Sequence, residues 1–105
     1  MDLNKTVLVG RLTKDIELSY TQGGMSYTNF SIANNYKYKD EKKVNFIDCV
    51  AWSKTAELMN QYLKKGSMVA IDGRLQQDTW EKDGQKRSKL KVIVDSIQFL
   101  GGKDD

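Results

Sequence analysis

Hydrophobic and polar positions alternate along most of this chain, which is the pattern of half-buried β-strands. Residues 3–12, 27–38 and 44–52 are rich in β-branched and aromatic side chains and are predicted to form three strands. Gly10 lies inside the first of them, where a glycine marks a bulge or a sharp bend. The first half of the chain is therefore predicted to be mostly β-sheet.

Turn and loop signals separate these strands. Gln22-Gly23-Gly24 predicts a turn between residues 16–21 and the strand at 27–38. The charged cluster at residues 39–43 predicts a solvated loop between the second and third strands.

The period of the pattern changes after residue 52 and predicts one helix. Ala56, Met59 and Leu63 recur at spacings of three and four residues and form an apolar stripe. Ser53 precedes the stripe and is the expected N-cap, and Gly66 follows it as the expected stop. The stripe is expected to pack against the sheet.

Residues 67–81 and 86–100 return to the strand pattern, and Asp83-Gly84 between them is a strong hairpin-turn signal. Three strands, a helix and two strands predict an all-β barrel with one helix. This is the order of the OB-fold, a five-stranded Greek-key barrel with the helix between strands 3 and 4 and a long hairpin of strands 4 and 5. Other small α+β folds share the order. We expect a single domain over residues 1–100 and a short flexible end at 101–105.

The residue types present exclude several kinds of chemistry. The chain has no histidine and a single cysteine, Cys49, which removes histidine-based acid–base catalysis and the usual zinc ligand sets. No phosphate-binding glycine loop is present. Asp48 and Asp72 lack a neighbouring acid or base and are expected to be solvated or ion-paired, and Cys49 is expected to be a core residue. We expect no catalytic site, no cofactor and no metal.

The chain also lacks the patterns of membrane and exported proteins. No apolar run approaches the roughly 20 residues of a membrane span. The N-terminus does not resemble a signal peptide, so a cytoplasmic protein without a membrane partner is expected. The net charge of +3 is a weak signal, and the distribution of the charges matters more.

Two aromatic residues share one face of the third predicted strand. Strand alternation puts Phe46 and Trp52 together with Asp48 and Val50, opposite a face of smaller residues that includes Cys49. If the smaller side faces the barrel interior, both rings lie on an outer surface. The opposite arrangement, with the rings in the core beneath the helix, fits the periodicity equally well.

Trp80 lies on the polar face of the last hairpin, near its tip. Alternation groups it with Arg74 on its own strand and with Arg87 and Lys89 on the returning strand. The other face of the hairpin is predicted to be core, at Val69, Ile71, Leu75, Leu90, Val92 and Val94. An exposed tryptophan among basic residues indicates binding; the alternative is a ring folded back onto its hairpin or onto a subunit neighbour.

Flat rings set among cations are what a protein needs to bind unpaired nucleic acid. Stacking on an aromatic ring is worth about 1–3 kcal/mol per base, and cations neutralise the phosphates. The Tyr36-Lys37-Tyr38-Lys39 segment repeats this combination, although a polar strand end would look the same. Readers of duplex DNA present a recognition helix instead, whereas the one predicted helix here needs its apolar stripe for the core. The pattern favours a binder of single strands.

Several segments, taken in order, resemble the single-stranded DNA-binding protein (SSB) family of bacteria and phages. They are NKTVLVGRLTKDIEL with SYTQGG, NFSIA, NFIDCVAWSKTAE, YLKKGSMVAIDGRL and DSIQFL. The resemblance covers residues 3–100 and is specific in the combination of VGRL, YLKKGS and DGRL. It implies sequence-independent binding and protection of single-stranded DNA in replication, recombination and repair, by a homotetramer of OB domains.

The resemblance also implies which residues contact the DNA. The family's stacking positions correspond to Tyr38, Phe46, Trp52 and Trp80. Basic residues at positions suited to phosphate contacts are Arg11, Lys54, Arg74, Arg87 and Lys89. The strand pattern had independently singled out these positions as candidates, although it left open whether Phe46 and Trp52 face outward or into the core.

The sequence departs from the family in three places. Ile16 stands where members usually have proline, and Ile47 where some have a histidine in the subunit contact. Cellular members continue into a tail with an acidic tip that recruits replication and repair proteins, whereas this sequence ends at GGKDD, as a core fragment or a short form of phage type. Recruitment of such partners is therefore not assumed.

Two other functions fit the same fold. One is a replication-restart or RNA-binding OB protein. The other is a protein–protein module in which the exposed aromatic residues form a subunit or partner interface.

Overall fold

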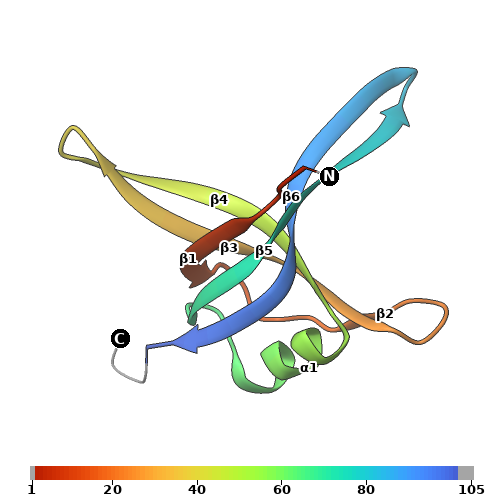
Figure 1. The fold of residues 1–105 in the computed structure, drawn as a ribbon, viewed down its shortest axis with the longest axis horizontal. Helices are drawn as coiled ribbons and strands as arrows, with labels where there is room; N and C mark the ends of the chain where they lie inside the picture. Colours follow the sequence, from red (N-terminus) through yellow and green to blue (C-terminus); the bar gives the residue numbers. More distant parts are fainter. Residues whose placement is uncertain (1, 102–105) are drawn as a thin grey trace.

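The computed structural model describes residues 2–101, which form six strands and one helix (Figure 1). The elements in chain order are β1 (Thr6–Leu12), β2 (Ser19–Tyr20), β3 (Ser26–Tyr38), β4 (Glu41–Trp52), α1 (Ser53–Tyr62), β5 (Met68–Lys82) and β6 (Gln85–Leu100). The predicted order of three long strands, a helix and two long strands is confirmed. One additional strand, β2, has two residues and pairs with the start of β3 across the predicted glycine turn.

The strands wrap into a partly open barrel with the order β1-β5-β6-β4-β3-β2 and a further pairing of β1 with β3. All pairings are antiparallel except that of β4 with β6. The pairings of β1 with β3 and of β4 with β6 consist of two residue pairs each, so only short stretches of strand pairing close the barrel at these two places. This is the predicted OB architecture.

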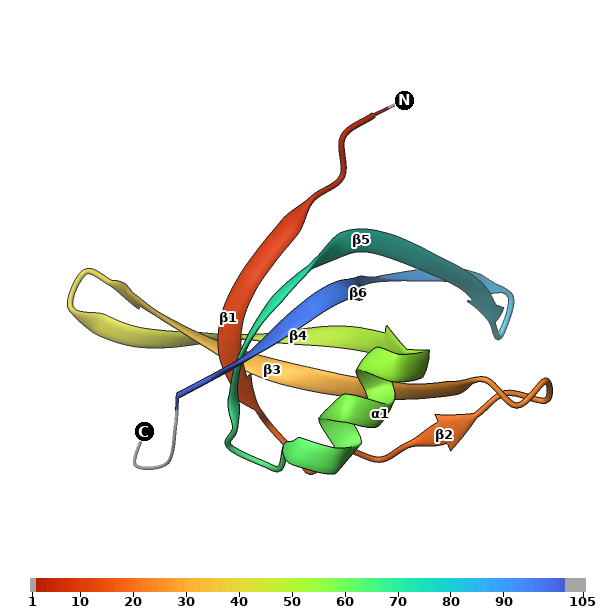
Figure 2. The same cartoon turned by 60° about the horizontal axis from the view of Figure 1, so that its bottom comes forward.

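The core fills the barrel and continues beneath the helix. The strands supply Leu12, Ile32, Cys49, Ala51, Val69, Ile71, Val92 and Val94, and all of them are at most 7% exposed. Ala56 and Met59 of α1 are fully buried, while Leu63 packs against the core from its edge, so the predicted stripe is confirmed. Figure 2 shows α1 lying against β3 and β4.

Both ends of the helix differ from the prediction. Trp52 is the N-cap without a side-chain cap bond, and Ser53 is the first helical residue, with φ +53°. The helix ends at Tyr62, four residues before Gly66. The backbone N–H of Gly66 donates to the carbonyl of Leu12 at 2.9 Å, so this glycine ties the turn after the helix to the end of β1.

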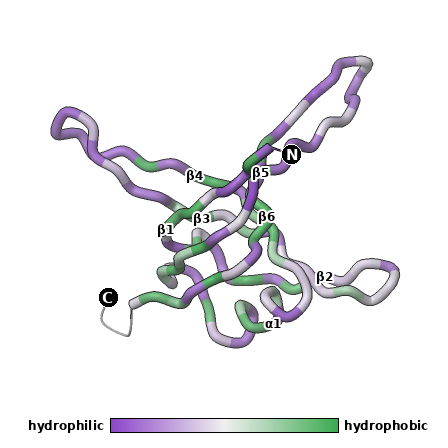
Figure 3. Tube along the Cα trace, in the orientation of Figure 1, coloured by the Kyte–Doolittle hydropathy of each residue, from purple (hydrophilic) through white to green (hydrophobic). Residues whose placement is uncertain are grey.

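Two long hairpins, β3–β4 and β5–β6, extend beyond the barrel (Figure 1). A β-bulge at Asp72/Gly73 interrupts the register of β5 and β6, and a Cβ on Gly73 would collide with the carbonyl oxygen of Ile93. Beyond Leu75 and its partner Val92 the hairpin leaves the core. Figure 3 shows that the far ends of both hairpins are mainly hydrophilic.

The prediction that Leu75 and Leu90 are core residues is wrong. Leu75 is 44% exposed and Leu90 is 59% exposed. Leu75 is the cross-strand partner of Val92 and Leu90 alternates with it, so all three share a face. Val92 is fully buried where β4 pairs with β6, whereas that pairing does not reach Leu75 or Leu90. No helix among residues 2–101 has the length and apolarity needed to cross a membrane.

Candidate nucleic-acid interface

Phe46 and Trp52 lie on the outer face of β4. The inner face carries Cys49 and Ala51, which are at most 2% exposed, whereas Phe46 is 69% and Trp52 is 38% exposed. The smaller residues therefore face the barrel interior, and the alternative with both rings in the core is excluded. Phe46 pairs with Ala33 on β3, whose small side chain cannot cover an aromatic ring.

Trp52 has an aromatic neighbour that sequence reasoning missed. Tyr27 on β3 pairs directly with Trp52, and their ring centroids lie 5.0 Å apart at an interplanar angle of 32°. This spacing is typical of a favourable aromatic pair, so Tyr27 orients the Trp52 ring while part of that ring stays open to solvent. Strand alternation alone could not identify this pair, because identifying it requires knowledge of which residues of β3 and β4 lie opposite each other.

Trp80 lies near the tip of the β5–β6 hairpin and is 44% exposed. It pairs with Arg87 across the hairpin. Together with Lys86 and Lys89 these residues line a shallow depression, completed by Gln85 and Ser88. The predicted grouping of Trp80 with basic residues on one face is confirmed.

Tyr38 is exposed but faces another direction. Nζ of Lys39 lies 5.4 Å from the centroid of its ring, within the range of a cation–π contact. Ala33 is the cross-strand partner of Phe46, and Tyr38 lies an odd number of positions after Ala33 on β3. Strand alternation therefore directs Tyr38 and Phe46 to opposite faces of the β3–β4 hairpin.

The basic candidates fall into two groups. Lys54 follows the Trp52 position on the exposed start of α1, and Arg87 lies across from Trp80; within residues 2–101 neither has an ion-pair partner. Arg11, by contrast, is half-buried and donates from Nη1 to the Gly66 carbonyl at 3.0 Å.

Two further candidates are held by carboxylates. Arg74 Nη1 lies 2.7 Å from Asp95 Oδ1, and Lys89 Nζ lies 2.7 Å from Asp48 Oδ2. The expectation that Asp48 is solvated or ion-paired is confirmed. The equivalent expectation for Asp72 is also confirmed, since it pairs with Lys5 at 2.7 Å.

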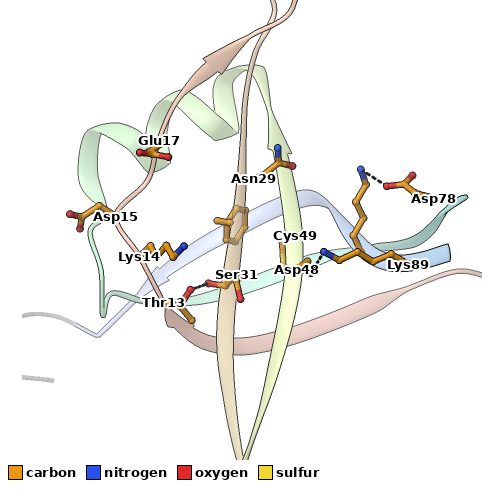
Figure 4. A pocket seen from close by; sticks show the side chains of 12 residues that line it. Thr13, Lys14, Asp15, Glu17, Asn29, Ser31, Asp48, Cys49, Asp78 and Lys89 are labelled. Atoms are coloured by element: carbon orange, nitrogen blue, oxygen red, sulfur yellow. Dashed lines mark hydrogen bonds and ion pairs between the residues drawn. The ribbon is translucent and has the colours of Figure 1, made fainter. Parts of the chain in front are cut away.

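A groove of about 430 Å³ lies between the β3–β4 wall and the β5–β6 hairpin (Figure 4). Asn29 and Ser31 of β3 and Asp48 of β4 contribute to it. Its remaining lining residues are Thr13, Lys14, Asp15, Glu17, Phe30, Cys49, Asp78, Lys89 and Lys91. Sequence reasoning did not identify this groove, because its walls come from five separate segments of the chain: residues 13–17 and parts of β3, β4, β5 and β6.

Two titratable groups beside the groove have shifted pKa values. Hydrogen bonds from Lys91 and Gln76 lower the pKa of Asp78, so its carboxyl group remains ionised. Burial, with a smaller contribution from the nearby Asp48 charge, raises the pKa of the Cys49 thiol to about 12. Cys49 is therefore the inert core residue that was predicted.

No group of three or more His, Cys, Asp or Glu side chains within residues 2–101 is arranged to hold a metal ion. Among the exposed aromatic rings of the described surface are Phe46, Trp52 and Trp80, and the same surface carries several cations and a polar groove.

Comparison with known proteins points in the same direction. The model of the family described as "Single-strand binding protein family" matches residues 3–100. The chain is 47% identical over 105 residues to a protein of Borreliella burgdorferi and 45% identical over 104 residues to one of Treponema pallidum, both named single-stranded DNA-binding protein. These alignments cover 94% and 95% of this chain but 70% and 59% of the two relatives, so the chain spans less than two-thirds of the Treponema protein.

A solved structure described as "Plasmodium falciparum SSB complex with ssDNA" has a similar fold. It superposes with a TM-score of 0.88 at 25% sequence identity and covers 96% of this chain and 97% of the other. The similarity extends over the whole barrel and its hairpins and confirms the OB-fold.

Proposed function

Since the chain belongs to the single-strand binding protein family, we propose that it binds single-stranded DNA without sequence preference and protects it during replication, recombination and repair. One observation supports this most directly: Phe46, Trp52 and Trp80 expose their rings to solvent, and Trp80 does so beside Lys86, Arg87 and Lys89. Bases of any sequence have a flat face, so stacking on such rings requires no particular sequence.

The proposed stacking residues differ in whether DNA can reach them without a rearrangement. Phe46, Trp52 and Trp80 are accessible without rearrangement. Tyr38 would contribute only to a strand that also crosses to the other face of the β3–β4 hairpin. The role is binding alone, and we propose that the protein is not an enzyme, needs no cofactor and acts on DNA in the cytoplasm.

Among the cations, Lys54 and Arg87 are available for phosphate contacts beside Trp52 and Trp80. Arg74 and Lys89 first have to leave their carboxylate partners, and Arg11 its carbonyl partner.

We propose that the binding form is a homotetramer. The support is an apolar strip on β1, where Val7 is 66% and Val9 is 45% exposed. Exposed apolar side chains on a strand are favourable contacts for a second copy of the same chain. Light scattering coupled to gel filtration measures the mass directly, and a monomer that binds DNA at full affinity would contradict this part of the proposal.

Intrinsic fluorescence tests the binding itself. The chain has two tryptophans, Trp52 and Trp80, and both belong to the proposed site. Titration with oligo-dT should quench their emission, because a stacked base lies against each indole ring. Unchanged emission at saturating oligo-dT would contradict stacking on tryptophan.

Competition at fixed salt tests the substrate class. Unlabelled single-stranded DNA should displace a labelled oligo-dT, whereas duplex DNA should displace it poorly because its bases are already stacked. Tighter binding of RNA would favour an RNA-binding OB protein instead.

A further inference from the structure

The groove between the β3–β4 wall and the β5–β6 hairpin carries more negative than positive charge. Its cations are Lys14, Lys89 and Lys91, and its anions are Asp15, Glu17, Asp48 and Asp78. The depression beside Trp80 has the opposite balance, with Lys86, Arg87 and Lys89 and no carboxylate in its lining. A nucleic acid that runs between Phe46 and Trp80 along the hairpin therefore meets carboxylates on the way.

Four of these groups form a row of alternating charges that leads from β4 into the hairpin. Asp48 Oδ2 contacts Lys89 Nζ at 2.7 Å, and Lys91 Nζ contacts Asp78 Oδ2 at 2.9 Å. Asp78 is also the cross-strand partner of Lys89. Lys89 thus has one carboxylate in contact and a second directly across the ladder (Figure 4).

These ion pairs are accessible to solvent. The side chains of Lys89 and Asp48 are 58% and 49% exposed, and those of Lys91 and Asp78 are 27% and 41% exposed. Exposed ion pairs are weak, so a phosphate that approaches the lysines can displace the carboxylates. The displaced carboxylate then remains close to the phosphate and repels it.

We propose that Asp48 and Asp78 compete with the DNA backbone for Lys89 and Lys91, and that they thereby weaken binding and reduce its dependence on salt. The inference rests on the proposed function and adds two residues that set the affinity of the site. The salt dependence arises because a lysine that neutralises a phosphate releases cations condensed on the DNA, whereas a displaced carboxylate beside that phosphate retains cations and reduces the net release. A lysine without such a partner contributes fully to the release.

The decisive variant is Asp48→Asn, which keeps the shape of the side chain and removes its charge. It should bind oligo-dT about two- to fivefold more tightly at low salt, the size expected for one exposed ion pair. The slope of log K against log salt should become steeper by about 0.7, which corresponds to one additional phosphate contact on a single strand. Asp78→Asn should act in the same direction through Lys91.

A control variant separates this effect from a general gain of positive charge. Asp72→Asn removes a carboxylate from another exposed lysine pair, that with Lys5, and Asp72 does not line the groove. It makes the same change in net charge. Its affinity and salt slope should remain close to those of the unmodified protein, and thermal melting should show that all variants are folded.

The pairing between Lys89 and Asp48 can be tested directly with Lys89→Gln. In the unmodified protein this change should weaken binding only slightly, because Lys89 is already held by Asp48. In the Asp48→Asn background it should abolish the gain in affinity and return the slope to its original value.

The outcomes distinguish this inference from the proposed function. If the unmodified protein does not bind oligo-dT, both are wrong. If it binds and Asp48→Asn leaves affinity and slope unchanged, shifts them no more than Asp72→Asn does, or weakens binding, the competition is wrong and binding of single-stranded DNA stands.

Discussion

The side-chain amide of Asn4 forms hydrogen bonds with both the backbone C=O and the backbone N–H of Leu75. Its Nδ2 donates to the Leu75 carbonyl at 2.8 Å, and its Oδ1 accepts the Leu75 N–H at 2.9 Å. Pairing of β1 with β5 ends at Thr6 and Gly73, so the Asn4 amide extends the ladder beyond the last backbone pair. The N-terminal segment thereby holds the base of the hairpin that carries Trp80.

Replacement of Asn4 by alanine should loosen this base. Two hydrogen bonds at an exposed site are lost, and we expect about 1–2 kcal/mol less free energy of unfolding. Urea denaturation measures the loss, and hydrogen exchange at the Leu75 amide should accelerate. Asn35→Ala, at an exposed strand position, is the matched control; an equal loss in both variants would show that the Asn4 bonds contribute nothing specific.

Gly73→Ala should be strongly destabilising, because the new Cβ would meet the backbone carbonyl of Ile93, which cannot move aside as a side chain can. We expect a loss of about 3 kcal/mol or more in the free energy of unfolding, measured by chemical denaturation. Gly23→Ala is the control, since the nearest atom to its Cβ would be 3.9 Å away. Near-normal stability of Gly73→Ala would mean that β5 and β6 separate easily at the bulge.

Phe46→Ala and Trp80→Ala should each reduce affinity for oligo-dT by about 10- to 100-fold, which corresponds to one stacked base. Phe46 is 69% and Trp80 is 44% exposed and neither belongs to the core, so thermal stability should change little. Tyr20→Ala removes another exposed ring, 64% accessible and outside the proposed site, and should bind normally. If Trp80→Ala altered the oligomeric mass but not DNA affinity, the tryptophan would belong to a protein interface.

Cys49 should make stability fall at alkaline pH. Its pKa rises from 9.0 to about 12 on folding, because burial disfavours the thiolate. Below pH 9 both folded and unfolded forms keep the proton, and its contribution to stability is complete. Between pH 9 and about 12 the unfolded chain loses the proton first, so this contribution is lost as the pH rises.

Comparison with Cys49→Ala tests this assignment, since alanine preserves a small apolar side chain without a titrating group. The difference in free energy of unfolding between the two proteins should change between pH 9 and 12. A constant difference would show that the thiol ionises equally in both states. In native protein at neutral pH, thiol reagents should react with Cys49 only as fast as the chain opens.

Alternation identified the face of several strand residues in the barrel, although Val50, which it groups with the exposed Phe46 and Trp52, is buried. It grouped Phe46 with Trp52, and it identified Val92 as a core residue. It failed at Leu90, two positions further on the same face, because periodicity reports which side a residue faces and not whether anything covers that side.

By itself the sequence determined the order of strands and helix, the turns, the grouping of aromatic residues with cations and the absence of histidine chemistry, because these depend on local patterns and residue types. Only the tertiary structure decided which face of β4 points outward, which lysines are held by Asp48 and Asp78, and where the hairpins leave the core. Those features depend on contacts between segments distant in the chain, and one residue of change in register would rearrange them.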